Sequence, residues 1–378
     1  MTSRRDFVRR GLALGGIAAA GGAACLFERL AAQAICPSAG PLGELVGHVP
    51  FRGTGPEPPF GALVGGPGLD ARMFTDLSDL APDRLITPTE RVFIRTTVPP
   101  RLDRQTSIPI ADLARDARPM GAHLIECAGN TDPRNYGLMS VAEWDGVPLA
   151  DAIDRLGAAP GAAAVRVTGL DHDAPSLRSA PGASWIVPLD ALDRLGAFLA
   201  VRMNGAALPP DHGAPVRLVV PGWYGCAWIK WVNELRLVRA DEPATAQMKE
   251  FASRTHQAGI PPLARDFAPP AIDLAATPVR IEKRRVAGRL EYRVVGIVWG
   301  GDRTVDRLLI RFSAPGPFAP LDVCPRPRTH RTWSLWEYRW RPTEPGIYDI
   351  VLKAADTSIR TRRLDMYFYT RRVLIDEV

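Results

Sequence analysis

The sequence predicts two folded domains, a mixed α+β domain followed by an all-β domain. The chain has 378 residues, and at roughly 150 residues per domain this length suits two domains. With 46% apolar and 23% charged residues, its composition is that of a globular protein long enough to bury real cores. The 34 glycines and 36 prolines favour turn-rich β structure over long helical bundles.

The first element, residues 1–34, is predicted to be a cleavable export signal. The paired Arg4 and Arg5 precede an uncharged stretch over residues 11–26, and Ala-Gln-Ala at 32–34 provides a small-x-small cleavage site. This apolar stretch is shorter than the ~20 residues that a spanning helix needs, although a membrane anchor remains an alternative. The signal resembles a twin-arginine signal, which predicts export of the folded protein by the twin-arginine machinery and a periplasmic location.

Charge and cysteine usage exclude several functional classes. The formal net charge of +6 falls to +3 if the first 34 residues are removed, because 42 basic and 39 acidic residues remain, so no nucleic-acid footprint is expected. The five cysteines form no CxxC or CxxCH motif, which excludes a zinc ribbon and attached c-type haem. Any disulfide among Cys36, Cys226 and Cys324 is left open.

Residues 35–87 are rich in proline and glycine and are expected to form an irregular N-terminal extension. From 88 to 245, short apolar runs alternate with turn signals, which predicts an α+β domain. Its expected elements are strands at 123–126, 164–167 and 215–220 and short helices at 149–156 and 189–195.

The last two segments differ from the first domain in their pattern. Residues 246–277 show no sustained periodicity and are predicted to be a linker. In 278–378, strand-like runs recur between turn signals, which predicts an antiparallel β-sandwich of immunoglobulin type. The second domain is therefore expected to be an immunoglobulin-like β-sandwich.

Three segments of the first domain carry candidate chemistry. Cys127 ends an apolar strand and is followed by Ala-Gly-Asn, so a tight turn could present its sulfur to a pocket, although a buried structural cysteine is the alternative. The run 221–231 holds two glycines, four aromatic residues and Lys230, and its backbone and ammonium could hold an anion. A third turn carries His212 and Arg217.

These segments, with the runs at 93–95, 143–149, 169–171 and 203–205, resemble the sulfite oxidase family of molybdopterin-dependent oxidoreductases in order and spacing. The resemblance covers most of the chain after the signal. It implies a sulfite-oxidase-like molybdopterin-binding domain, one Mo-molybdopterin per chain, and an immunoglobulin-like dimerisation domain that makes a homodimer.

The resemblance also implies roles for single residues. Cys127 would be the thiolate ligand of molybdenum, and a soft thiolate suits that metal. Arg95 would face metal and substrate, and so would Arg363, with Arg362 as the neighbouring alternative. The residues that match the family's cofactor contacts are Phe93, Ile94, Arg95, Thr96, Thr97, Asp171, His212, Arg217, Trp228, Ile229 and Lys230.

The chain departs from the family at the expected substrate site. Where sulfite oxidases carry two arginines after the cysteine turn, this chain has Thr131 and Asp132, and Arg134 follows two residues later. Phe251 replaces a family tyrosine. The expected substrate residues are therefore Arg95, Asp132, Arg134, Phe251 and Arg363. Because a carboxylate opposes binding of a dianion, we expect weak sulfite binding or a different substrate.

The expected function is oxo transfer to or from a small anionic or sulfur-containing substrate, with an external electron carrier because the chain has no haem motif. A sulfoxide-type reductase on the same cofactor is one alternative. A cofactor-free exported binding protein that keeps the scaffold is the alternative from another class. The sequence leaves the substrate, the electron acceptor and the direction of electron flow open.

Overall fold

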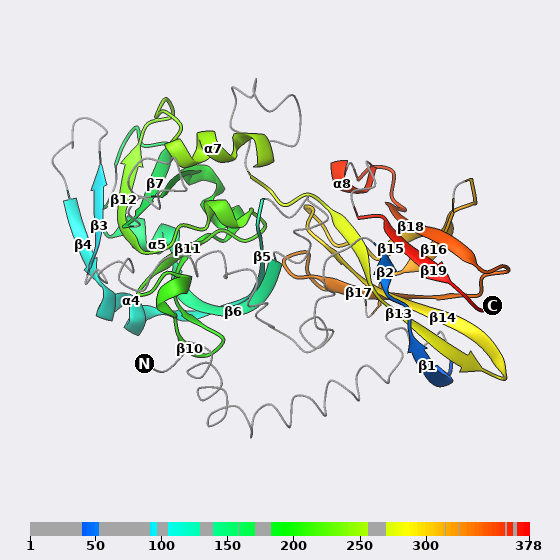
Figure 1. Cartoon of the computed structure of the whole chain (residues 1–378). Coiled ribbons are helices and arrows are strands. Elements are labelled where there is room, and N and C mark those ends of the chain that lie inside the picture. Colours follow the sequence, from blue (N-terminus) through cyan, green and yellow to red (C-terminus); the bar gives the residue numbers. More distant parts are fainter. Residues whose placement is uncertain are drawn as a thin grey trace, which may run out of the picture.

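The computed structural model describes residues 40–52, 91–96, 105–128, 139–157, 159–170, 183–255, 270–313, 315–324, 326–359, 361–365 and 369–378. These residues form two domains that lie side by side, each built on two β-sheets (Figure 1). No helix within these ranges has the length and apolar character needed to cross a membrane.

The first domain holds two five-stranded sheets. One sheet has the order β10 (Ala206–Ala207), β9 (Phe198–Met203), β6 (Met139–Pro148) and β5 (Arg118–Glu126), with β11 (Arg217–Val219) also paired to β9. The other has the order β4 (Gln105–Pro109), β3 (Arg91–Thr96), β12 (Val232–Val238), β7 (Ala164–Gly169) and β8 (Ser184–Pro188). Strands β3 and β12 run parallel, and the other strand pairs described in both sheets are antiparallel.

Prolines connect strands to helices at three places in this domain. Pro109, Pro148 and Pro188 each end a strand and occupy the N-cap position of the following helix or 3₁₀ turn, because a proline has no N–H with which to continue the sheet ladder. The helices and 3₁₀ turns of the domain are α4 (Ile110–Asp116), α5 (Leu149–Asp154), η5 (Leu189–Ala191), α6 (Leu192–Leu195), η6 (Pro210–His212), η7 (Gly225–Ala227) and α7 (Ala246–Thr255). The predicted mixture of short helices and strands is therefore present.

The second domain is a two-layer antiparallel β-sandwich. One sheet has the order β1 (Glu44–His48), β13 (Ala275–Val286), β14 (Arg289–Trp299) and β17 (Ser334–Trp340). The other has the order β16 (Ala319–Asp322), β15 (Arg307–Arg311), β18 (Gly346–Ala354), β19 (Arg371–Ile375) and β2 (Phe51–Arg52), and the short helix α8 (Arg362–Asp365) precedes β19.

A buried apolar cluster fills the space between these two sheets. It includes Tyr292 and Trp336 from one sheet and Leu308 and Ile350 from the other. Gly296 lies under the Trp336 ring, and a Cβ at this position would collide with that ring, so the close packing of the indole requires glycine. The sheets confirm an all-β second domain, and its immunoglobulin type stays a prediction.

Two segments differ from the sequence expectation. The extension 35–87 is not irregular throughout, because β1 pairs with β13 and β2 pairs with β19, so each adds an edge strand to one sheet of the sandwich (Figure 1). The expected linker 246–277 contains the helix α7 and the start of β13. Strands of two and five residues are too short to show periodicity, and their pairing partners lie more than 200 residues away in sequence.

The two domains share a third apolar cluster at their junction. Leu124 and Val141 from the first domain pack with Ile297 and Trp299 from the second. Strand β5 is the edge of its sheet, and the N–H of Leu124 donates to the carbonyl of Arg331 at 2.7 Å. The end of β5 therefore lies at the boundary between the domains.

Candidate active site

Cys127 follows β5 directly, so its thiol lies at the domain junction. It is half-buried and not part of a disulfide. The 3₁₀ turn η7 runs against the strand end, because a Cβ on Gly225 would lie 3.0 Å from Ile125 Cγ1 and 3.3 Å from the carbonyl oxygen of Glu126. Glycine at 225 therefore lets the 221–231 loop approach the residue that precedes the cysteine.

The other cysteines have different environments. Cys226 is a half-buried thiol that contributes to both the first-domain core and the junction cluster. Its carbonyl accepts a hydrogen bond from Gln247 Nε2 at 2.6 Å. Cys324 is disulfide-bonded, and its partner lies outside the described residues.

The segments around His212, Arg217 and Trp228–Lys230 come together in the structure. The Arg217 guanidinium donates to the carbonyls of His212 at 3.0 Å and Trp228 at 3.2 Å. Backbone bonds run from Leu218 N–H to the carbonyl of Ile229 at 2.7 Å and from Trp231 N–H to the carbonyl of Gly213 at 3.2 Å. The loops on either side of β11 thus form one hydrogen-bonded cradle.

Arg217 is a buried cation without a counter-charge in the part of the chain that the structure describes. Its side chain is 2% exposed, and its guanidinium carbon lies 5.4 Å and 5.8 Å from the ring centroids of Trp144 and Trp228. Its Nε has no hydrogen-bond partner among the described residues, and burial lowers the pKa of the guanidinium to about 9. Because a buried, uncompensated charge is unfavourable, this cradle fits an anionic group such as the phosphate of a pterin cofactor.

Lys230 lies against the same cradle. Its Nζ is 4.2 Å from the centroid of the Trp231 ring, and its side chain is half-buried. Gly213 has a φ of +105°, and a Cβ there would lie 2.8 Å from Lys230 Cβ. A glycine at 213 therefore satisfies both the left-handed backbone and the close approach of the lysine.

The remaining predicted cofactor residues are only partly described. Phe93, Ile94, Arg95 and Thr96 belong to β3, whose backbone pairs with β12, and Thr96 is buried. The side chains of the first three are not described. Thr97 and Asp171 lie outside the described residues, and so do the predicted substrate residues Asp132 and Arg134.

Arg363 is bound to the residue before the cysteine. Its guanidinium lies 2.5 Å from Glu126 Oε1, with both side chains at most 1% exposed, and it also contacts the carbonyl of Asp273. Trp299 Nε1 donates to Glu126 Oε2 at 2.8 Å. Burial acts to lower the pKa of Arg363, but the Glu126 carboxylate and the nearby phenol of Tyr224 hold it well above its usual range.

Two residues expected to contact the substrate, Arg363 and Phe251, lie in described parts of the structure. Arg363 was expected to face the substrate, and in the structure its charge is matched by Glu126, so a substrate contact stays a prediction. Phe251 lies in α7, half-buried against the first-domain core and the junction cluster. A contact of Phe251 with substrate also stays a prediction.

Sequence reasoning missed the roles of Glu126, Trp144 and Trp299. The position of Glu126 in the sequence could have indicated its role, because an acidic residue at the end of an apolar strand needs a buried partner. The roles of the two tryptophans could not be predicted, since nothing in their local sequence shows which charged group they contact.

Comparison with known proteins agrees with this geometry. Residues 91–246 match the family model described as oxidoreductase molybdopterin binding domain. The chain is 29% identical over 317 residues to mitochondrial sulfite oxidase from Macaca fascicularis, covering 74% of this chain and 57% of that protein. It is also 29% identical over 322 residues to sulfite oxidase from Gallus gallus, covering 74% and 69%. The chain thus spans little more than half the length of the mammalian relatives it matches.

A solved structure shows the same fold. The crystal structure of the sulfane dehydrogenase SoxCD from Paracoccus pantotrophus aligns with a TM-score of 0.57 at 18% identity, covering 78% of this chain and 80% of that chain. This likeness shows a shared fold, and the relationship rests on the matched domain and the similarity to sulfite oxidases over 74% of the chain. The chain belongs to the sulfite oxidase family of molybdopterin-dependent oxidoreductases.

Proposed function

We propose that this protein is an exported Mo-molybdopterin enzyme that oxidises a small sulfur-containing anion and passes the electrons to an external carrier. The observation that carries the proposal is the Cys127 thiol at the domain junction, next to a loop that continues into the cradle of Arg217. The relatives named sulfite oxidase and sulfane dehydrogenase support a sulfur-containing substrate.

The residues present fit the cofactor. Cys127 would ligate the metal as a thiolate, and Arg217, Lys230 and the His212 turn would hold the pterin and its phosphate. When bound, the cofactor supplies a metal centre that exchanges two electrons and one oxygen atom with a substrate. The apolar junction around Leu124 and Trp299 packs beside the strand end that carries the cysteine.

The reaction is balanced for sulfite as the simplest substrate. Sulfite and water give sulfate, two protons and two electrons, and the electrons leave for the carrier. No haem-attachment motif occurs in the sequence, which supports an external carrier. The signal-like residues 1–34 support export, and the family resemblance supports a homodimer through the sandwich at 278–378.

Metal analysis and a cysteine exchange test this proposal. The protein is purified after co-expression with molybdopterin synthesis, and molybdenum and pterin are measured per chain. We expect about one of each, and sulfite-dependent reduction of an artificial acceptor. Cys127→Ser should keep the pterin and lose turnover, because its cradle is formed by other residues, whereas the matched control Cys226→Ser should keep both.

Three outcomes would contradict the proposal. Protein that carries no molybdenum after co-expression would favour the cofactor-free binding protein. Full activity of Cys127→Ser would exclude this cysteine as the essential ligand. If the loaded enzyme instead consumes a reduced dye with a sulfoxide and ignores sulfite, the direction of transfer is reversed.

A further inference from the structure

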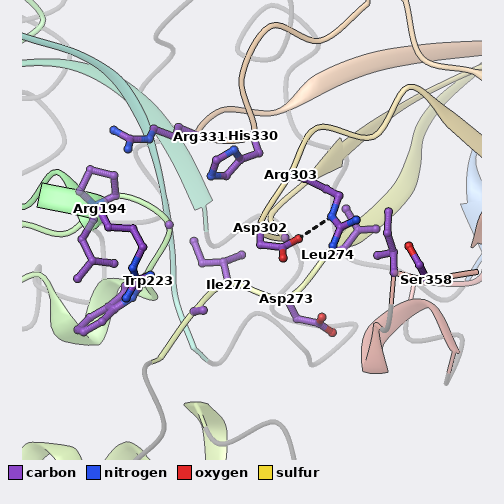
Figure 2. A pocket seen from close by; sticks show the side chains of 16 residues that line it. Arg194, Trp223, Ile272, Asp273, Leu274, Asp302, Arg303, His330, Arg331 and Ser358 are labelled. Atoms are coloured by element: carbon purple, nitrogen blue, oxygen red, sulfur yellow. Dashed lines mark hydrogen bonds and ion pairs between the residues drawn. The ribbon is translucent and has the colours of Figure 1, made fainter. Parts of the chain in front are cut away.

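A cavity of about 700 Å³ lies between the two domains (Figure 2). Its lining comes from the end of α6, the loop before η7, the segment that leads into β13, and loops of the sandwich. Cys127, Arg217, Lys230 and Arg363 do not line it. The cavity therefore lies beside the proposed cofactor cradle, sharing residues 221–223 of its loop but none of these four side chains.

The cavity carries positive charge that the described residues do not balance. Arg194 and Arg331 approach it from the two domains, and neither makes an ion pair within the described ranges (Figure 2). Arg303 is different, because its guanidinium pairs with Asp302 at 3.2 Å, drawn as a dashed line in Figure 2. The Asp273 carboxylate also lines the cavity. It accepts hydrogen bonds from the Thr361 hydroxyl and the backbone N–H of Arg363, and it makes no ion pair with Arg194 or Arg331.

Apolar groups form the rest of the wall. Trp223 is 4% exposed, and Ile272 and Leu274 are 3% and 2% exposed. His330 stands beside Arg331, and its burial and the nearby guanidinium lower its pKa, so it can offer a neutral N–H donor at pH 7. A volume of this size suits a small organic molecule, and the mixture of groups suits one with an anionic head and an apolar body.

We propose that this cavity binds a small organic anion, with its charged head between Arg194 and Arg331 and its apolar body against Trp223. Such a ligand contacts both domains at once. The carbonyl of Arg331 accepts the N–H of Leu124 in β5, and the guanidinium of Arg331 stands beside Gly196, which ends α6. A bound anion therefore holds the Arg331 loop onto the first domain and stabilises the junction. This proposal does not depend on the substrate of the enzyme.

Isothermal titration and thermal unfolding of the purified protein test this site with three probes. Naphthalene-2-sulfonate has the anionic head and apolar body, 2-naphthalenemethanol lacks the charge, and inorganic sulfate lacks the apolar body. We expect only the sulfonate to bind in the micromolar to submillimolar range and to raise the melting temperature. Arg194→Gln and Arg331→Gln should each weaken this binding about tenfold or more, since each removes a charge-assisted contact.

Arg307→Gln is the matched control, because Arg307 is an exposed arginine paired with Asp322 on the far sheet of the sandwich. It should leave sulfonate binding unchanged. Arg194 is exposed, so its variant should fold even if Arg331→Gln does not. Equal binding of the alcohol, equal binding of sulfate, or sulfonate binding unaffected by Arg194→Gln would each overturn the proposal.

Discussion

Replacing Glu126 by glutamine removes the counter-charge of a buried arginine while keeping the side-chain volume. Glu126 receives Arg363 Nη1 at 2.5 Å, Arg363 Nη2 at 3.4 Å and Trp299 Nε1 at 2.8 Å, and its side chain is fully buried. A glutamine can still accept the tryptophan bond but leaves the guanidinium uncompensated. Breaking one side of a buried ion pair costs about 3–5 kcal/mol of unfolding free energy.

This loss is large enough to measure by thermal unfolding, since about 1 kcal/mol shifts the melting temperature of a domain of this size by roughly 2–4 °C. Because Glu126 precedes Cys127, we also expect the visible absorption of the loaded protein to change, as the thiolate is displaced. Glu337→Gln is the control within the sandwich. Glu337 pairs with Arg293 at 2.6 Å and is equally buried, but Arg293 keeps Glu282 at 3.2 Å. The control should lose less stability and leave the spectrum unchanged.

A second exchange separates the lost charge from a simple packing defect. In the Glu126→Gln background, Arg363→Met removes the uncompensated guanidinium and should recover much of the lost stability. An unchanged melting temperature for Glu126→Gln, or no recovery in the double variant, would refute the reasoning. A spectral change of the same size in Glu337→Gln would show that the effect is not local to the cysteine.

Three further outcomes follow from single residues. Arg217→Met should lower the pterin content of the purified protein, because it removes the cation of the cradle and its hydrogen bonds to the carbonyls of His212 and Trp228; unchanged content would exclude Arg217 from the cradle. Burial lowers the pKa of His123 to about 4, so the folded state stays neutral while the unfolded chain protonates near its ordinary value of 6.5. The unfolding free energy should therefore fall by about 3 kcal/mol as the pH drops from 6.5 to 4, and thermal unfolding of His123→Phe should lack this part of the slope. Asp132→Arg should lower the KM for sulfite about tenfold or more, and a KM that rises instead would show a differently organised substrate site.

The sequence could predict much of the first domain, because its signals are local. Strands that end in Pro109, Pro148 and Pro188 switch to helices for a reason that lies in the proline itself. Cys127 could be placed at a strand end from the apolar run before it and the Ala-Gly-Asn after it. The sequence links the segments of His212, Arg217 and Lys230 only through the family resemblance, and hydrogen bonds and close packing bring them together in the structure.

Only the tertiary structure decided which charges are balanced and where the domains meet. Glu126 and Arg363 are 237 residues apart in sequence, and no periodicity links them, yet burial makes each the partner that the other requires. The same holds for β1 and β2, whose few residues become strands because distant edges accept them. Local sequence determines the elements and the chemical groups they carry, whereas burial and long-range pairing determine which groups remain available for a ligand.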